Sequence, residues 1–103
     1  MIQISVYTHE GMIREIRVSG HSGSAEKGKD LICAGVSAIT FGLCNALDIL
    51  TDVQDIEVNG NRIVIRTDDT SEKVQTILQA GVIQLETIQE TAEQFIQMKK
   101  TEV

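Results

Sequence analysis

The sequence predicts a single α+β domain with the element order ββαββα, in which an antiparallel sheet packs with two helices. Segments in which apolar and polar residues alternate occur in two pairs, and each pair contains a turn signal. Each pair precedes a longer segment whose apolar residues recur at intervals of three and four, which is the repeat of a helix. Because every predicted strand has a polar face, we expect the sheet to be antiparallel. Whether both helices cover the same face of the sheet stays open.

Length and composition indicate one soluble globular domain that spans residues 1–103. A chain of 103 residues with 42% hydrophobic and 23% charged residues can bury a single core. The formal net charge is −6, and no basic cluster exceeds the pair Lys99–Lys100. Nucleic acid is therefore not expected as a direct ligand, because phosphate contacts need a basic face. No signal-peptide pattern precedes the first strand, so a cytoplasmic location is expected.

Two hairpins supply the four predicted strands. The first covers residues 1–19 with a turn at residues 9–11, and His9 in this turn is assigned no role. The second covers residues 52–67, where Asn59–Gly60 marks the turn because this pair tolerates positive φ at both turn positions. The apolar residues that alternate along these strands are Ile2, Ile4, Val6, Ile16, Val18, Ile56, Val58, Ile63 and Ile65.

Residues 31–47 contain no charged side chain and predict a long apolar helix. Such a segment approaches the length of a membrane span, but small and polar residues dilute it, and Asp48 and Asp52 follow. A buried core helix is therefore expected, and no membrane association. A stripe of small residues (Ala34, Ala38, Gly42 and Ala46) lets a further helix approach closely, either from this chain or from a second copy. The face expected against the sheet consists of Ile32, Val36, Ile39, Leu43, Leu47 and Leu50.

The second helix is predicted to begin after the acidic and hydroxyl residues at 68–72, which are typical of a helix N-terminus. Its apolar residues continue to recur at intervals of three and four through Ala92 and Phe95. We expect it to end at residues 98–100, where two lysines suit a helix C-terminus. Gly81 is expected to weaken this helix.

The segment GHSGSAEKGKDLICAGVS at residues 20–37 carries the candidate chemistry. His21 ends a strand, Cys33 falls in the first turn of the apolar helix, and a loop rich in glycine and serine joins them. With Asp30 as the helix cap, Cys33 is the third residue of the helix, where unpaired amides and the helix dipole stabilise a thiolate. A base and a nucleophile joined by a lid-like loop are the parts of a thiol active site. Alternatively, His21 only ends the strand and Cys33 is a small core residue.

Two neighbours of Cys33 have both a functional and a structural interpretation. Ser37 lies one helical turn beyond Cys33 and could bind the sulfur or a substrate, or it could bond back to a helix carbonyl. Asp30 could orient His21, or it could act only as a cap. Cys33 and Cys44 lie about 16 Å apart along the helix axis at the rise of an α-helix, so they can neither form a disulfide nor share a metal ion. Cys44 is therefore expected in the core, and no metal or cofactor is expected.

The motif of Gly20–His21 followed by DLICAGVS at residues 30–37 resembles the signature of the ribosomal-processing cysteine proteases, and the resemblance extends over the whole chain. It implies that His21 and Cys33 are the catalytic residues, and that Gly20, Asp30 and Ser37 support the site or bind substrate. Ser22 and Gly35 depart from the family pattern, in which alanine is frequent at these positions.

The resemblance implies a cytoplasmic, homodimeric endopeptidase that acts in ribosome assembly without a cofactor. Its substrate would be the precursor of a large-subunit ribosomal protein, which loses an N-terminal extension by cleavage after a pair of aromatic residues. The loop at residues 22–29 would be a lid that substrate orders. Two alternatives stay open: a non-catalytic ribosome-associated protein that binds the same tail, and a cysteine enzyme that acts on a small molecule in a closed pocket.

Overall fold

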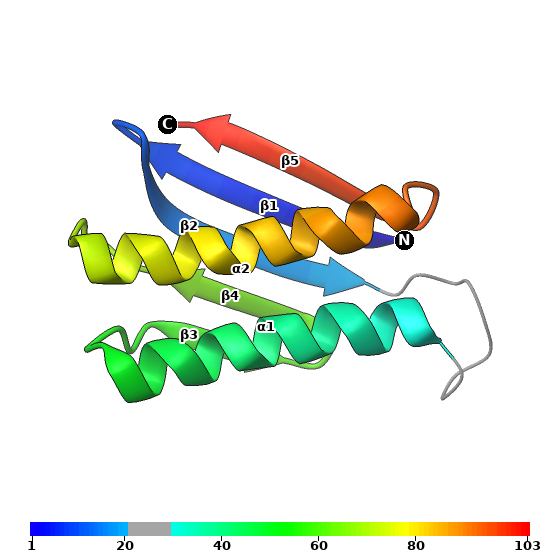
Figure 1. The fold of residues 1–103 in the computed structure, drawn as a ribbon, viewed down its shortest axis with the longest axis horizontal. Coiled ribbons are helices and arrows are strands. Elements are labelled where there is room, and N and C mark those ends of the chain that lie inside the picture. Colours follow the sequence, from blue (N-terminus) through cyan, green and yellow to red (C-terminus); the bar gives the residue numbers. More distant parts are fainter. Residues whose placement is uncertain (21–29) are drawn as a thin grey trace.

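The computed structural model describes residues 1–20 and 30–103, and the expected catalytic residue His21 and the loop at 22–29 lie outside this part of the chain. The described chain forms one five-stranded sheet and two helices (Figure 1). The elements are β1 (Ile2–His9), β2 (Met12–Gly20), α1 (Leu31–Leu50), β3 (Ile56–Asn59), β4 (Arg62–Arg66), α2 (Glu72–Thr91) and β5 (Ile96–Glu102).

The sheet has the strand order β3-β4-β2-β1-β5. The β1–β2, β2–β4 and β3–β4 pairs are antiparallel, whereas β5 lies parallel to β1. Both helices lie on one face of the sheet, and no helix covers the other face in the described chain (Figure 1). The α+β class is confirmed, but the sheet is mixed and not purely antiparallel.

The prediction for the end of the second helix is wrong, because α2 ends at Thr91 and a fifth strand follows. The spacing from Ala92 to Phe95 fits a helix, but short apolar segments do not distinguish a helix from a strand. Ile96 is 2% exposed and Met98 is half-buried, which is the alternation of a strand, but the rest of β5 is exposed at the sheet edge. Lys99 and Lys100 therefore lie on an edge strand, where lysines discourage pairing with another sheet.

The two hairpins turn differently. In the first, Glu10 and Gly11 both have positive φ, at 53° and 78°, and His9 is the last residue of β1. In the second, the loop residues are Gly60 and Asn61, and only Gly60 has positive φ. This is the pattern of turns with glycine at the first central position, so the expectation of positive φ at both positions is wrong.

The core lies between the sheet and the helices, and its members from α1 partly match the prediction. Cys44 is 8% exposed, as expected, and burial raises the pKa of its thiol. Leu50, which was expected to face the sheet, is 56% exposed because it ends the helix beyond the packed face. The side chains of α1 that are buried are Val36, Thr40, Leu43, Cys44 and Leu47.

At Gly81, α2 packs closely on α1. A Cβ atom at this position would lie 2.6 Å from Cδ2 of Leu43, which is buried. The residue that looked like a weak point in the helix thus allows close approach of the two helices. The small-residue stripe of α1 continues this contact, because Ala38, Gly42 and Ala46 line a groove between α1 and α2.

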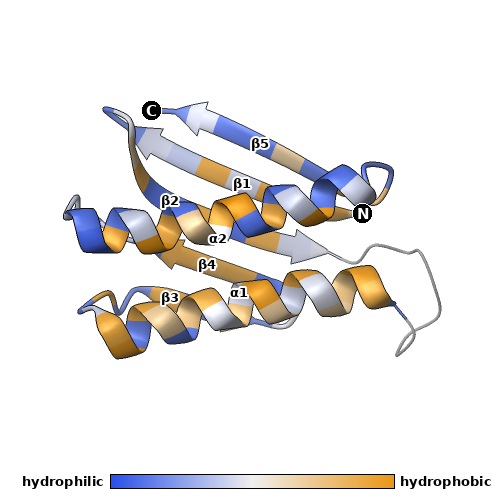
Figure 2. Ribbon diagram, in the orientation of Figure 1, coloured by the Kyte–Doolittle hydropathy of each residue, from blue (hydrophilic) through white to orange (hydrophobic). Residues whose placement is uncertain are grey.

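The outer side of α1 remains apolar and exposed. Figure 2 shows hydrophobic residues along much of this helix, and Leu31 and Ile49 are 84% and 77% exposed. By length and composition, α1 is the one helix in the described chain that could cross a membrane. Its inner side packs in the core of the domain, as the sequence predicted.

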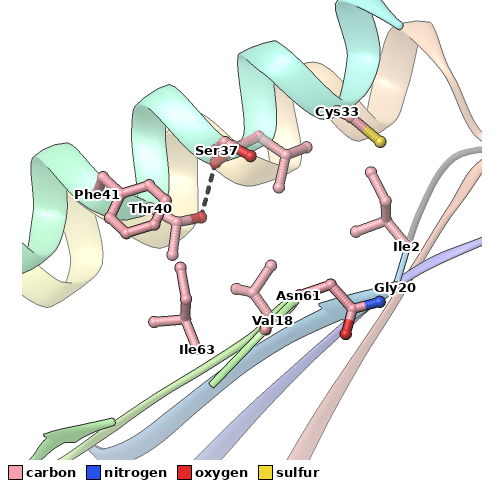
Figure 3. A pocket seen from close by; sticks show the side chains of 11 residues that line it. Ile2, Val18, Gly20, Cys33, Ser37, Thr40, Phe41, Asn61 and Ile63 are labelled. Carbon is pink, nitrogen blue, oxygen red and sulfur yellow. Dashed lines mark hydrogen bonds between the residues drawn. The ribbon is translucent and has the colours of Figure 1, made fainter. Parts of the chain in front are cut away.

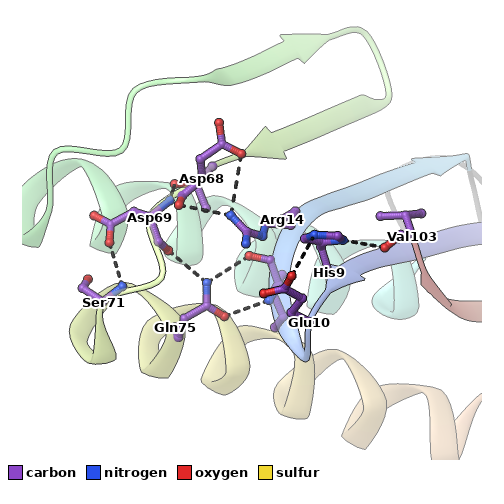
Figure 4. A network of polar contacts seen from close by, with 10 residues as sticks. His9, Glu10, Arg14, Asp68, Asp69, Ser71, Gln75 and Val103 are labelled. Atoms are coloured by element: carbon purple, nitrogen blue, oxygen red, sulfur yellow. Dashed lines mark hydrogen bonds and ion pairs between the residues drawn. The ribbon is translucent and has the colours of Figure 1, made fainter.

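A buried glutamine links α2 to the first hairpin at the end of the molecule away from residue 20 (Figure 4). Gln75 is 4% exposed, and its carboxamide accepts from the Ile13 N–H and donates to the Ile13 carbonyl. The same amide nitrogen donates to the carbonyl of Asp69, just before α2 begins. The N-cap of α2 is Ser71, whose hydroxyl accepts from the Val74 N–H, as the sequence of this segment predicted.

Candidate active site

A pocket of about 470 Å³ lies where the first half of α1 faces the end of β2 and the β3–β4 turn (Figure 3). Three of the five predicted site residues line it, namely Gly20, Cys33 and Ser37. Asp30 lies immediately before α1, and His21 follows Gly20 but lies outside the described residues. The remaining residues of the lining are Ile2, Val18, Val36, Thr40, Phe41, Gly60, Asn61 and Ile63.

Asp30 caps α1, as predicted. Its backbone is extended, and its Oδ1 accepts a hydrogen bond of 3.0 Å from the Cys33 N–H. This bond satisfies one of the amides that a helix N-terminus leaves unpaired. The cap therefore fixes where the helix begins and makes Cys33 its third residue. A further role of Asp30 toward His21 falls outside the described part of the chain.

Cys33 lies at the edge of the core and opens onto the pocket. Its side chain is partly buried and packs against the core cluster, and Figure 3 shows the sulfur projecting from α1 into the pocket. Cys33 is thus a partly buried residue that both contacts the core and lines the pocket, whereas Cys44 lies in the core, as predicted. Amides that a helix N-terminus leaves unpaired can stabilise an oxyanion that forms on a substrate.

Ser37 is exposed and lines the pocket one turn after Cys33. Its hydroxyl makes no hydrogen bond with any residue that the structure describes, so the alternative in which it bonds back to the helix is wrong. Thr40 shows that behaviour instead, because its hydroxyl donates to the Val36 carbonyl at 2.7 Å. Ser37 is thus an exposed hydroxyl in the lining of the pocket.

Gly20 ends β2 with a backbone that only glycine adopts readily. Its φ is +93°, and a Cβ atom would lie 2.3 Å from the carbonyl oxygen of Met1. A side chain at this position would therefore push the start of β1 away from the end of β2, or turn the chain in another direction. The positive φ of Gly20 and the close approach of Met1 therefore explain why a glycine precedes His21.

The apolar floor of the pocket and its hairpin wall were not anticipated from the sequence. Val18 and Ile63 are a register pair of β2 and β4, and Ile2 comes from the start of β1. Phe41 is 45% exposed at the rim, two turns along α1 from Cys33. Val18 and Ile63 meet through the pairing of β2 with β4, which connects segments that are distant in the sequence.

The described part of the pocket combines a thiol with a helix N-terminus and apolar side chains. In residues 1–20 and 30–103, no group of three or more His, Cys, Asp or Glu side chains could hold a metal ion. A thiol nucleophile, the amides of a helix N-terminus and an apolar groove are suited to attack on a peptide carbonyl.

Comparison with known proteins assigns the family. The chain matches the family model of the cysteine protease Prp over residues 1–97. The ribosomal processing cysteine protease Prp of Staphylococcus aureus is 34% identical over 103 residues, which cover 95% of this chain and 97% of that protein.

Two crystal structures of the essential ribosomal processing protease Prp from S. aureus share the fold. The one in complex with a covalently linked product peptide aligns with a TM-score of 0.91 at 32% identity. The one in complex with a substrate peptide aligns with a TM-score of 0.86 at 30% identity, and each alignment covers 97% of this chain and 99% of the other. The chain therefore belongs to the Prp family of ribosomal processing cysteine proteases.

Proposed function

We propose that this protease removes an N-terminal extension from the precursor of a large-subunit ribosomal protein, with Cys33 as the nucleophile and His21 as the acid and base. The observation that carries the proposal is the position of Cys33, at the capped N-terminus of α1 and open to a groove. The S. aureus relative, of nearly equal length and the same fold, holds a covalently linked product peptide. His21 is assigned from the sequence motif that it shares with Cys33.

The reaction proceeds by two acyl transfers. The Cys33 thiolate attacks the scissile carbonyl, and amides of the first turn of α1 stabilise the resulting oxyanion. The imidazolium of His21 then protonates the leaving amine, and the N-terminal extension remains on Cys33 as a thioester. Water, deprotonated by His21, attacks the thioester and releases the extension as a carboxylic acid.

The shape of the active-site pocket, which is an open groove along α1, favours a peptide over a small molecule. Cys33, Ser37 and Phe41 lie along one side of α1 over eight positions, which is about 12 Å at the rise of a helix. An extended peptide covers this length with about four residues. The apolar floor of Val18 and Ile63 suits the aromatic residues that precede the cleaved bond in the expected substrate. The alternative of a non-catalytic ribosome-associated protein is not supported, because the matched family consists of proteases.

Cleavage of the extended ribosomal protein tests the proposal. The purified chain is incubated with the precursor, and the products are weighed by mass spectrometry. We expect loss of the extension with the wild type and with Cys44→Ala, and no cleavage with Cys33→Ala or His21→Ala. Cleavage by a folded Cys33→Ala protein, or an intact precursor with wild-type enzyme, would contradict the proposal.

We further propose that the protein acts in the cytoplasm as a homodimer that pairs through the outer side of α1. The groove between α1 and α2, of about 350 Å³, is lined by Ala38, Gly42 and other small residues. A Cβ atom on Gly42 would meet nothing within 4 Å, so the fold of one chain does not require glycine there. The same two helices carry exposed apolar residues, such as Ile49 on α1 and Ile83 on α2, at 77% and 61% exposure. A second copy would cover them.

A further inference from the structure

Asn61 forms part of the wall of the active-site groove that faces α1. It occupies the second position of the β3–β4 turn and lines the same pocket as Cys33 and Ser37. In Figure 3 its carboxamide lies across the pocket from Ser37, near the end of β2 at Gly20. The groove thus has a polar side chain on each of its two walls.

The turn itself does not require an asparagine at this position. Asparagine is common in turns because it tolerates positive φ, but here the positive φ belongs to Gly60 and not to Asn61. The Asn61 side chain is exposed and makes no hydrogen bond with the described chain. Its carboxamide is therefore neither a turn-stabilising group nor a tie between strands.

The hairpin holds Asn61 in a fixed place relative to the groove. Arg62, the next residue, pairs with Asn59 of β3 on one side and with Ser19 of β2 on the other. The turn therefore follows directly from two strand pairings. A side chain on such a turn can bind a ligand with a small loss of conformational entropy, because its backbone is already fixed by the strand pairings.

The chemistry of the groove indicates what Asn61 would bind. A peptide that enters the groove exchanges contact with water for contact with an apolar floor. Each of its peptide groups then needs a hydrogen-bond donor and an acceptor from the protein. A carboxamide supplies both, since its oxygen accepts from a peptide N–H and its nitrogen donates to a peptide carbonyl. Ser37 on α1 can satisfy only part of this need from the opposite wall.

We infer that Asn61 is a substrate-positioning residue, whose carboxamide pairs with one peptide group of the bound substrate. The inference rests on the proposed function, because it takes an extended peptide as the ligand of the groove. Asn61 contacts the peptide backbone and not the reacting atoms, so it contributes to binding equally in the ground state and in the transition state. Loss of such a contact raises KM and leaves kcat unchanged.

Steady-state kinetics on a peptide that spans the cleavage site test the inference. Asn61→Ala removes the carboxamide, whereas Asn61→Asp keeps its shape but cannot donate to a carbonyl. We expect each to raise KM on the order of tenfold, with kcat within about twofold of wild type. Asn59→Ala is the matched control, since Asn59 is exposed on the same hairpin but does not line the groove. It should keep the wild-type KM.

Binding measured without turnover gives the second readout. In a Cys33→Ala background, calorimetric titration with the same peptide should show a Kd about tenfold weaker when Asn61→Ala or Asn61→Asp is added. A wild-type KM and Kd in both Asn61 variants would overturn the inference, as would a loss of equal size in Asn59→Ala. If the wild type itself fails to cleave the peptide, the proposed function fails, and the inference with it. Cysteine-dependent cleavage that does not respond to Asn61 refutes the inference alone.

Discussion

At the scale of single residues, the site depends on Gly20 as well as on side chains that carry chemistry. Gly20 places the end of β2 against the start of β1, and its φ of +93° directs the chain into the segment that begins with His21. The sequence motif contains this glycine, but only the structure gives its reason, which is the carbonyl of Met1. The close approach is invisible in the sequence because it joins the two ends of a hairpin.

Gly20→Ala should lower both stability and activity. The substitution combines a strained positive φ, at roughly 1–3 kcal/mol, with a clash against the backbone of Met1. Gly11→Ala is the matched control, because Gly11 also has positive φ but a Cβ there would meet nothing within 4 Å. Chemical denaturation should show a larger loss of the free energy of unfolding for Gly20→Ala than for Gly11→Ala. Equal losses would show that the contact with Met1 contributes nothing.

The sequence predicts those residues of the site that lie close together along the chain. Asp30, Cys33 and Ser37 lie on one helix start, so spacing alone gives the cap, the position of the thiol and the neighbour one turn on. Asn61 and Ile63 could not be predicted, because they reach the groove through the pairing of β2 with β4. No local pattern encodes that pairing.

At the scale of elements, the strand that was missed shows the limit of periodicity. Residues 92–98 fit a helical spacing, and the edge strand β5 buries too few side chains to display a clear alternation. Its pairing with β1 is parallel and connects the two ends of the chain. By contrast, the other four strands and the start of both helices follow from alternation, turn residues and caps, which are local signals.

Gln75→Leu should destabilise the domain without changing the active site. The variant leaves the buried N–H and carbonyl of Ile13 without the Gln75 carboxamide, and a buried unsatisfied group costs about 1–3 kcal/mol. Gln79→Leu is the control one turn further along α2, where the side chain is exposed and the change should stay within about 0.5 kcal/mol. Denaturant unfolding measures both. An unchanged stability of Gln75→Leu would mean that the contact between α2 and the first hairpin is not held by this side chain.

The start of α2 should contribute a pH-dependent part of the stability. Hydrogen bonds from the backbone N–H and the side chain of Ser71 lower the pKa of Asp69 in the folded protein. In the unfolded chain an aspartate has a pKa of about 4. The stabilisation is thus present above that pH and is lost as the pH falls through the lower, folded-state pKa.

Asp69→Asn isolates this effect, since asparagine keeps an oxygen that accepts from Ser71 but has no charge to titrate. The stability advantage of the wild type over Asp69→Asn should be constant at neutral pH and shrink between about pH 5 and pH 2. Thermal unfolding across this range measures the difference. A difference that grows as the pH falls would contradict the assigned direction.

At the scale of the whole molecule, one layer of helices covers one face of the sheet, and the outer side of α1 stays apolar (Figure 2). The sequence predicts a buried core helix here, with a small-residue stripe that a helix from this chain or from a second copy can approach. Within one chain the burial of this helix is incomplete, because Leu31 and Ile49 remain exposed. The proposed homodimer would provide the missing cover.

Ala38→Arg should dissociate the homodimer. Ala38 is exposed and lines the groove between the helices, so an arginine there would hold a second copy away. Sedimentation velocity should give twice the 11.3 kDa mass of one chain for the wild type and the mass of one chain for Ala38→Arg. Gln3→Arg on the sheet, also at an exposed position, should stay dimeric. A monomeric wild type, or a dimeric Ala38→Arg protein, would exclude pairing through this face.

The most direct test of the account is the mass of the enzyme during turnover. Wild-type protein is mixed with the extended substrate, quenched in acid within the first turnover, and mapped by peptide mass spectrometry. We expect an adduct on Cys33, and none on Cys44, whose mass is that of the free N-terminal extension less one water. Turnover with no adduct on Cys33, or with the adduct on another residue, would contradict the thiol mechanism.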